Sequence, residues 1–372
     1  MTSSRKTVII GSGVFGLSTA YHLLQRGWSD ITVIDRSETL PAPDGASNDI
    51  NRIVRTSYSD PFYCELAKDA IAAWKDTELW SDTYHESGVL VVGSAARERD
   101  YVRKAHANDI AHGLRVTPTD TPDALRAVFP EDADVGDLAG HYTYFGLDGG
   151  WANAGQGVSL LIGKVRAMGG RVLGGKDVAG LVREGGKTVG VRCRDGSVLD
   201  ASLVVLATGS WTCSAFPDTA VSKLFQATGQ VVAMVQLTSE EAEVYRKCPV
   251  VLDFDSGFYV FPPNEQNILK MAIHAAGFTH SIGDGGISTP RTIKSDPETG
   301  LRIPKASVVR LRDGLRAVYP TLATKPFCAT RLCWSLPPRS LCVQPSYASS
   351  SGIMTRWTRT GPLDISRDLS RP

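Results

Sequence analysis

The chain has 372 residues, 42% of them hydrophobic and 21% charged, with a formal net charge of +1. This length favours two domains over a single core, and the near-neutral charge gives no reason to expect nucleic acid or an anionic membrane as a partner. No apolar run approaches the roughly 20 residues of a membrane span. The N-terminal residues run directly into a predicted strand, so no cleavable signal is expected.

The first motif is a predicted strand at 7–10, followed by a glycine-rich turn and a helix. Gly11, Gly13 and Gly16 have the spacing Gly-x-Gly-x-x-Gly, and a second apolar run ends at Asp35. The first glycine allows a tight turn, the second lets the backbone approach a pyrophosphate, and the third allows close helix–strand packing. The helix N-terminus offers free amides to phosphates, and Asp35 stands where a ribose hydroxyl would bind. This unit predicts a dinucleotide site.

A turn-rich stretch at 41–63 follows, and an amphipathic helix is predicted at 61–74, with Leu66, Ala67, Ile71 and Trp74 on one face. The next predicted elements are a strand at 88–92, a charged helix at 96–113, a helix at 158–168, strands at 171–173, 178–182 and 188–193, a hairpin turn at 195–196, and a buried strand at 203–207.

Beyond residue 215 the pattern changes to alternating strands. We predict strands at 230–235, 250–254, 258–261 and 268–273 and a returning helix at 305–319. Two sheet types predict an α/β fold, α+β overall, in which a discontinuous dinucleotide-binding domain is interleaved with an antiparallel-sheet substrate domain. The expected boundaries are 1–85, 145–215 and 325–334 for the first domain, 86–144 and 216–324 for the second, and 335–372 for an irregular tail.

The seven cysteines are odd in number, scattered, and free of any Cys-x-x-Cys pair. This argues against a zinc site and against a disulfide framework, so we expect no metal and a reducing, cytoplasmic compartment. Each cysteine is expected to be reduced and buried; they are Cys64, Cys193, Cys213, Cys248, Cys328, Cys333 and Cys342.

Seven separated motifs, in this order, resemble the FAD-dependent amine oxidases that include monomeric sarcosine oxidase, pipecolate and saccharopine oxidases, and fructosyl amino acid oxidases. The motifs are the glycine unit with Asp35, Arg-Ile-Val-Arg-x-x-Tyr at 52–58, Gly150-Trp151-Ala152, Ala207-Thr208-Gly209, Tyr259-Val260-Phe261-Pro262, Lys270-x-x-x-His274, and Arg331-Leu332-Cys333-Trp334. The resemblance covers roughly residues 6–334. It implies a Rossmann-like FAD-binding domain of the D-amino-acid-oxidase type, and hydride transfer from a C–N bond to flavin followed by reduction of O2 to hydrogen peroxide.

The resemblance also implies the cofactor contacts. Arg52 corresponds to a position beside the flavin ring, and Cys333 to a cysteine joined to the flavin as a thioether. The expected FAD-binding residues are Gly11, Gly13, Val14, Phe15, Gly16, Asp35, Arg36, Ser47, Arg52, Val178, Gly209 and Cys333.

Four residues are implied in catalysis. Arg55 corresponds to the residue that holds the substrate carboxylate, a task that suits a bidentate guanidinium. Lys270 corresponds to the lysine that promotes reduction of oxygen, and Tyr259 lines the pocket, as Tyr58 does with less support. His274 would share a strand face with Lys270. Arg52 and Arg55 would share a face only on a helix, and a pair of surface cations is the alternative.

Several alternatives stay open. Fructosyl amino acid oxidases generally have a glutamate where this chain has His274, which favours a small secondary amino acid such as sarcosine, pipecolate or saccharopine over a glycated one. After Trp334 the family's closing FAD segments are missing from the sequence, so a truncated, inactive flavoprotein is the second hypothesis. A nicotinamide-dependent reductase is the third. We expect a monomer, and no peroxisomal signal is readable.

Overall fold

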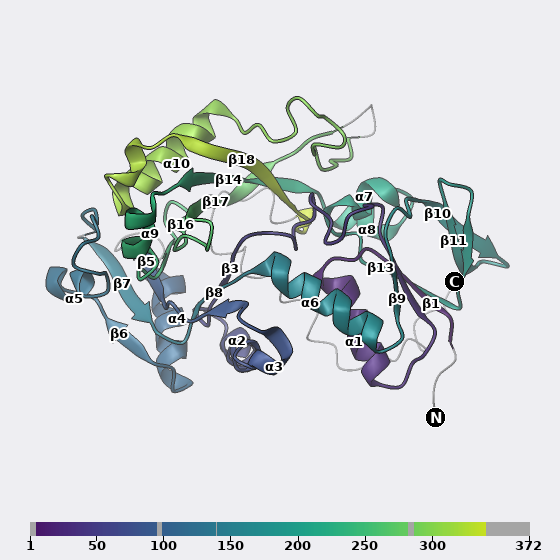
Figure 1. Ribbon diagram of the computed structural model, residues 1–372, viewed down its shortest axis with the longest axis horizontal. Helices are drawn as coiled ribbons and strands as arrows, with labels where there is room; N and C mark the ends of the chain where they lie inside the picture. The colour runs from purple at the N-terminus through teal and green to yellow at the C-terminus, as the bar shows by residue number, and fades with distance from the viewer. Residues whose placement is uncertain (1–4, 95–98, 139, 282–285, 340–372) are drawn as a thin grey trace.

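The computed structural model describes residues 5–94, 99–138, 140–281 and 286–339. Cys342 and most of the predicted irregular tail therefore lie outside the described residues. Figure 1 shows two halves, one built on a small parallel sheet and the other on a large, mainly antiparallel sheet. These two sheet types confirm the predicted α/β fold. The predicted domain boundaries remain a prediction.

The parallel sheet carries the glycine motif. Its strands lie in the order β13-β1-β2-β9, with β1 at Thr7–Ile10, β2 at Ile31–Ile34, β9 at Arg171–Leu173 and β13 at Leu203–Leu206. All residues of β1 and β2 are buried, whereas every residue of β13 is only half-buried. Among the described strands, β13 is the edge of this sheet on its side.

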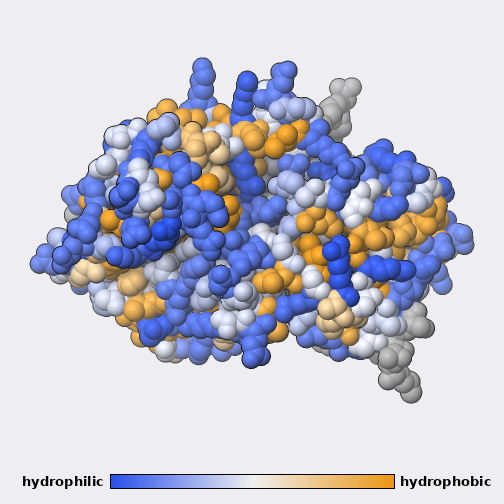
Figure 2. Space-filling view, in the orientation of Figure 1, coloured by the Kyte–Doolittle hydropathy of each residue, from blue (hydrophilic) through white to orange (hydrophobic). Residues whose placement is uncertain are grey.

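One face of the parallel sheet is covered by two helices, α1 (Val14–Gln25) and α6 (Ala154–Ala167), which pack on each other. Their apolar sides, including Leu17 and Leu161, form a core with Ile9 and Val33. The opposite face is covered by an antiparallel meander of β10 (Val178–Glu184), β11 (Lys187–Cys193) and β12 (Val198–Asp200). In Figure 2, apolar side chains gather on the surface over this half of the molecule.

The large sheet has eight strands in the order β18-β14-β17-β16-β15-β5-β7-β6. Neighbouring strands are antiparallel except β15 and β5, which are parallel. The bounds are β5 Val89–Ser94, β6 Val116–Pro118, β7 His141–Gly146, β14 Thr228–Gln236, β15 Val250–Asp253, β16 Phe258–Val260, β17 Ile268–Phe278 and β18 Phe327–Ser335.

Strict alternation along these strands divides the large sheet into two faces. On β5, Leu90 and Val92 face the core beneath α9 (Ser239–Tyr245) and α10 (Lys305–Val318), and Val89 and Val91 face α4 (Arg99–Ala111). On β17, Leu269, Met271 and Ile273 likewise enter the first core. Lys270, Ala272 and His274 therefore point the other way, toward the parallel-sheet half.

A third sheet of short strands lies between the two halves. It contains β3 (Arg52–Val54), β8 (Gly150–Ala152) and β4 (Tyr84–His85), in the order β3-β8-β4. The helix α2 (Pro61–Trp74) follows, and Asp60 caps it by accepting from the Phe62 amide at 3.0 Å. The remaining elements are α3 Thr77–Trp80, α5 Pro122–Arg126, η1 Gly209–Trp211, α7 Thr212–Ala215, α8 Ala220–Leu224 and η2 Leu322–Thr324.

Two expectations from the sequence, for Leu66 and Cys328, need correction, and the condition attached to Arg52 and Arg55 is not met. Leu66 is 42% exposed, because α2 buries Cys64 and Ile71 and turns Leu66 outward. Cys328 is exposed on the edge strand β18; the other described cysteines are buried and all six are free thiols. Arg52 lies on strand β3 with Arg55 just beyond it, so the two do not share a helix face. In the described part of the chain, no helix is long and apolar enough to cross a membrane.

The close approach between α1 and the glycine turn generates a prediction for stability. A Cβ at Gly16 would lie 1.9 Å from the Gly11 carbonyl oxygen, so Gly16→Ala forces the backbone apart. We expect the free energy of unfolding to fall by about 1–3 kcal/mol, as overpacking usually does. Urea unfolding followed by circular dichroism measures it.

Gly163 is the matched control, because it also lies in a helix but a Cβ there has no atom within 4 Å. Gly163→Ala should raise stability by about 0.5–1 kcal/mol through its better helix propensity. Equal losses in both variants would show that the packing around Gly16 is not tight.

Candidate active site

The glycine turn connects β1 to α1 and has the shape of a phosphate cradle. Gly11 has φ +110°, and a Cβ there would lie 2.3 Å from the Ala207 carbonyl oxygen, so only glycine fits. The α1 helix begins at Val14 with Gly13 as an N-cap that contributes no side-chain hydrogen bond. The Val14 amide donates to Ser47 Oγ at 3.0 Å, and Phe15 is 70% exposed. The helix end is thus open, with amides available to an anion.

Asp35 follows β2 and lies beside this turn. One of its carboxylate oxygens accepts from the Ser12 amide at 2.8 Å and the Ser12 hydroxyl at 2.9 Å; the other accepts from the Ser37 amide. Arg36 stacks over the Trp211 ring at 4.1 Å. Gly209 begins η1 in the left-handed region, and Val178 packs in the meander core beneath β1 and β2. The predicted residues for the adenosine half of FAD therefore gather at the carboxyl ends of β1, β2 and β13.

A second group of charged residues lies where the short sheet meets the large one. The Asp49 side chain is 1% exposed, and three cations surround it: Lys270 Nζ at 2.7 Å, Arg52 Nη2 at 3.1 Å and Arg331 Nη2 at 3.2 Å. Lys270 Nζ also donates to the Asn51 carbonyl oxygen at 2.6 Å. We call Asp49, Arg52, Lys270 and Arg331 the ionic cluster. It holds one carboxylate for three cations, and so carries excess positive charge.

The protonation of the ionic cluster follows from burial and from these contacts. Burial alone would raise the pKa of Asp49, but Lys270, Arg52 and Arg331 together hold that pKa below its usual value. Burial lowers the pKa of Lys270 to about 8, although Asp49 opposes the shift. Lys270 is therefore a cation at neutral pH that can lose its proton in mild alkali.

Cys333 lies against the same cluster. Arg52 Nη2 donates to Cys333 Sγ at 2.9 Å and to the Ala46 carbonyl oxygen at 2.7 Å. The thiol is buried in a small apolar group with Val232 and Ala272, against which Tyr259 packs. The structure thus brings the predicted Arg52, Cys333, Lys270 and Tyr259 together. Burial raises the pKa of Tyr259 to about 12, so its hydroxyl stays protonated.

Arg55 turns away from the ionic cluster. Its guanidinium stacks over Tyr58 at 4.1 Å, lies 5.4 Å from the Phe254 ring centre, and donates to the Ser57 carbonyl and hydroxyl oxygens. Among the described residues, no carboxylate lies within ion-pair distance of Arg55. Burial lowers the pKa of His274, and the Arg55 charge lowers it further, so the imidazole beside this cation is neutral.

The side chain of Asn51 tests whether these residues fit a cofactor. Asn51 is fully buried, and within the part of the chain that the structure describes neither its Oδ1 nor its Nδ2 has a hydrogen-bond partner. An unpaired buried amide costs free energy, and it is retained where a ligand supplies the missing partners. It lies beside the ionic cluster and beyond the glycine turn, at the reactive end of the expected dinucleotide. A ring system with both donors and acceptors, such as a flavin, fits this position.

Motif-based prediction missed four residues that the structure adds to the site: Asp49, Asn51, Asp109 and Arg331. Arg331 belongs to one of the seven motifs, but the motif assigns it no function. Asp49 and Asn51 stand in a polar, aperiodic stretch and carry no pattern of their own. Asp109, buried on α4 near Arg55, sits in a helix predicted as charged. The one available signal was the close spacing of Asp49, Asn51 and Arg52.

Taken together, the fold and the site define a dinucleotide-dependent oxidoreductase. The glycine turn and the α1 N-terminus can bind phosphates, and the ionic cluster gathers excess positive charge where the short sheet meets the large one. In the described residues, no group of side chains could hold a metal ion.

Comparison with known proteins identifies the family. The model of the FAD dependent oxidoreductase family matches residues 6–345, so the chain belongs to that family. L-saccharopine oxidase of Schizosaccharomyces pombe is 28% identical over 351 residues, which span 89% of this chain and 79% of that protein. Human peroxisomal sarcosine oxidase is 26% identical over 207 residues, or 55% of this chain and 50% of that protein.

A solved structure of an oxidase has the same fold as this chain. Fructosyl amine:oxygen oxidoreductase (amadoriase I) of Aspergillus fumigatus superposes with a TM-score of 0.77 at 27% identity, covering 91% of this chain and 78% of that one. These findings confirm the predicted family, the FAD-binding fold and the dependence on FAD. The chain is an FAD-dependent oxidoreductase of the class that acts on CH–NH groups with oxygen as acceptor.

Proposed function

We propose that the chain oxidises small N-substituted amino acids, of the sarcosine, pipecolate or saccharopine type, and releases hydrogen peroxide. The observation that carries this proposal is the Arg55 guanidinium, which lies next to a neutral His274. Its partners are aromatic rings and the carbonyl and hydroxyl oxygens of Ser57, and none of the described carboxylates pairs with it. Asp109 acts on this half-buried cation only through space and forms no direct ion pair with it, so the guanidinium remains free to bind a substrate carboxylate bidentately.

FAD would occupy the site in one orientation. The glycine turn and the α1 N-terminus would hold the pyrophosphate, and Asp35 would hold the adenosine ribose. Asn51, Arg52 and Lys270 would lie at the flavin ring. When bound, FAD supplies the hydride acceptor and the electrons for oxygen.

The residues around the substrate would act by positioning and by charge. Arg55 would fix the carboxylate, and neutral His274 can accept a hydrogen bond from the substrate amine. Tyr259 would exclude water from the reacting carbon. Lys270 would keep a proton at Nζ, and its positive charge would stabilise the negative charge that develops on oxygen during its reduction. Asp49 would keep that ammonium in place and protonated.

We further propose that Cys333 links covalently to FAD, that the protein is a monomer, and that it works in a reducing, cytoplasmic compartment. Its partners would be the amino acid substrate and O2. Support for the covalent link comes from the buried thiol that accepts from Arg52.

A fructosyl amino acid oxidase is the second candidate, because solved structures of that activity superpose over 91% of this chain. His274 disfavours it, since the imidazole lacks the negative charge that would accept from several sugar hydroxyls. Peroxide release with sarcosine, pipecolate, saccharopine and fructosyl-lysine separates the two candidates. If FAD-loaded protein releases no peroxide with any of these substrates, the hypothesis of an inactive flavoprotein is supported.

The role of Arg55 gives a prediction for substrate selectivity. Arg55→Gln removes the cation but keeps a planar polar group. The value of kcat/KM for the carboxylate substrate should therefore fall about 30- to 1,000-fold, which corresponds to a loss of about 2–4 kcal/mol of transition-state stabilisation. The same variant should change activity on the corresponding primary amide much less. Steady-state oxygen consumption measures both.

The matched control is Arg103→Gln. Arg103 also stacks on an aromatic ring, Tyr142 at 4.2 Å, but is exposed on α4. Its variant should match the wild type. If Arg55→Gln affects acid and amide equally, Arg55 does not bind the carboxylate.

The lowered pKa of Lys270 gives a prediction for pH dependence. If the protonated ammonium assists oxygen reduction, the rate of reoxidation of the reduced enzyme should fall as pH rises through about 8, the pKa of Lys270. Lys270→Met should be slower by about a hundredfold at neutral pH and show no such transition. Stopped-flow absorbance after anaerobic reduction measures the rate.

Lys176→Met is the control, because Lys176 is paired with Asp195 at the surface, which raises its pKa. That variant should keep the wild-type pH profile. The same transition near pH 8 in Lys270→Met would exclude Lys270 as its source.

The proposed covalent link has its own test. Acid precipitation of the purified, FAD-loaded protein should give a yellow pellet if Cys333 is attached, and Cys333→Ser should give a colourless pellet with the flavin in the supernatant. Cys328→Ser, on the same strand but exposed, should leave the pellet yellow. A colourless wild-type pellet would exclude the thioether.

A further inference from the structure

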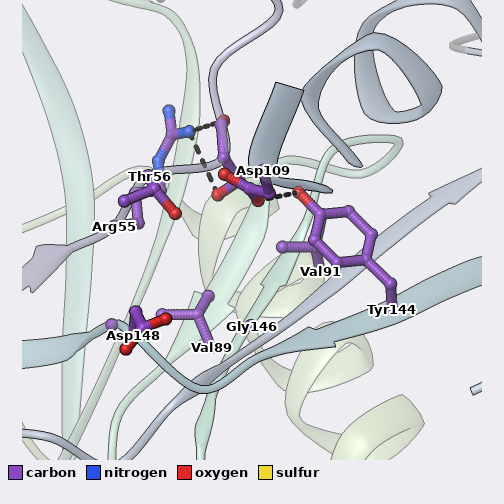
Figure 3. Close-up of a pocket in the computed structure, with 10 residues that line it drawn as sticks. Arg55, Thr56, Val89, Val91, Asp109, Tyr144, Gly146 and Asp148 are labelled. Atoms are coloured by element: carbon purple, nitrogen blue, oxygen red, sulfur yellow. Dashed lines mark hydrogen bonds between the residues drawn. The ribbon is translucent and has the colours of Figure 1, made fainter. Parts of the chain in front are cut away.

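A small cavity lies next to Arg55, on the side facing α4. Its volume is about 10 Å³, which is room for about one water molecule. Its wall includes Arg55, Thr56, Asp109 and Tyr144. In Figure 3, Asp109 lies between the Tyr144 hydroxyl and the Arg55–Thr56 segment. A carboxylate thus lies behind the guanidinium that we assign to the substrate.

Asp109 is buried, with 1% exposure, and its direct donors in the described ranges are neutral. Tyr144 OH donates to Oδ2 at 3.1 Å, Cys64 Sγ donates to Oδ1 at 3.4 Å, and the Thr56 hydroxyl also donates to the carboxylate. Arg55 acts on it through space, without a direct ion pair. Burial raises the pKa of Asp109, while these donors and the Arg55 charge oppose the shift. The carboxyl group can therefore change its protonation state in response to charge near Arg55.

The neighbouring titratable groups keep fixed protonation states. On α2, burial raises the pKa of Cys64 to about 12, and on β7 burial raises the pKa of Tyr144, so both stay protonated. On α4 itself, burial lowers the pKa of His106, which stays neutral. Asp148 lines the cavity too, but its carboxylate is bonded to Arg115 Nε at 2.7 Å. Across Arg55, His274 is neutral for the reason given above.

We propose that Asp109 is a positioning residue that balances Arg55 in the free enzyme and takes up one proton when a carboxylate ligand binds Arg55. This inference rests on the proposed role of Arg55. Before binding, Arg55 faces one unpaired carboxylate, that of Asp109, because Asp148 is paired with Arg115. After binding, Arg55 faces the carboxylates of Asp109 and of the ligand, and two anions that share one cation in a buried site are unfavourable. Protonation of Asp109 restores neutrality, and the proton comes from solvent.

The pH dependence of binding follows from this uptake. Ligand binding raises the pKa of Asp109. Between the pKa of Asp109 in the free enzyme and its pKa in the complex, the complex holds a proton that the free enzyme lacks; outside this pH window the two hold the same number. Below that window affinity is independent of pH. Within it, affinity falls up to tenfold per pH unit as pH rises, because one proton is bound with the ligand.

The experiment uses the FAD-loaded full chain and methoxyacetate, an ether that has the carboxylate but no amine to titrate and no C–N bond to oxidise. Dissociation constants come from the perturbation of the flavin absorbance between about pH 5 and pH 9, a range in which one linked proton gives a slope of up to one log unit per pH unit. Calorimetry in two buffers of different ionisation enthalpy counts the proton directly. We expect uptake with methoxyacetate and none with methoxyacetamide, its neutral analogue.

The variants assign the proton. Asp109→Asn keeps the shape and should abolish the uptake and the slope, whereas Asp148→Asn, in the same cavity wall, should keep both. Tyr144→Phe removes a donor that lowers the pKa of Asp109, so it should move the window to higher pH. This second variant keeps the test decisive if Asp109→Asn fails to fold, as judged by its melting temperature and flavin spectrum.

Two results would overturn the proposal: methoxyacetate binding without proton uptake, or uptake that persists in Asp109→Asn, which would assign the proton to another group such as His274. Failure of the proposed function looks different. In that case methoxyacetate and methoxyacetamide would bind alike, and Arg55→Gln would change neither.

Discussion

The site depends on the carboxylate of Asp49. It is buried, and it contacts three cations from three separate strands or their flanks: Lys270 on β17, Arg52 on β3 and Arg331 on β18. Without this carboxylate, three positive charges would share a low-dielectric space and repel one another. Removing one partner of such a buried group typically costs about 3–5 kcal/mol. Asp49 thus makes it possible to place cations at the reactive end of the site.

The same cluster joins the two halves of the molecule. Asp49 and Arg52 belong to the segment that follows the parallel sheet, and Lys270 and Arg331 belong to the large sheet. Because the cations outnumber the carboxylate, the ionic cluster keeps a net positive charge after all pairs are made. A preorganised charge of this kind stabilises an anionic ring or reduced oxygen without reorganisation at the moment of reaction. The roles that we propose for Lys270 and Arg52 at the flavin therefore depend on the same contacts that join the two halves.

Much of the fold could be predicted from the sequence, because its elements have strong local periods. The glycine turn, the alternating strands at β14 and β17, and the helix at 61–74 all follow such patterns. The shared face of Lys270 and His274 followed from the period of two along β17. The orientation of single residues was harder to predict: Leu66 lies on the exposed side of the 14-residue helix α2, and Arg52 lies on a strand of three residues. A three-residue strand carries too little pattern to indicate its type.

The site was predictable where a residue belongs to a motif and unpredictable where long-range contact creates its role. Asp49, Asn51 and Asp109 are unremarkable polar residues in the sequence. They become functional candidates because of their surroundings in the fold: Lys270 contacts Asp49, the Asn51 side chain lacks a partner among the described residues, and Asp109 lies in the same cavity wall as Arg55. A buried polar group is visible only after the chain has folded.

The sequence separations within the site bear on how the protein is made. Lys270 lies 221 residues from Asp49, and Cys333 lies 281 residues from Arg52, yet each pair is in direct contact. Contacts this distant in sequence form late, because the entropy of closing long loops opposes them until other parts have folded. During synthesis the glycine turn leaves the ribosome long before β18, so the adenosine half of the site can form while the ring half cannot. A shift of the flavin absorbance caused by enclosure of the ring, and not the absorbance itself, would therefore report completion of the fold.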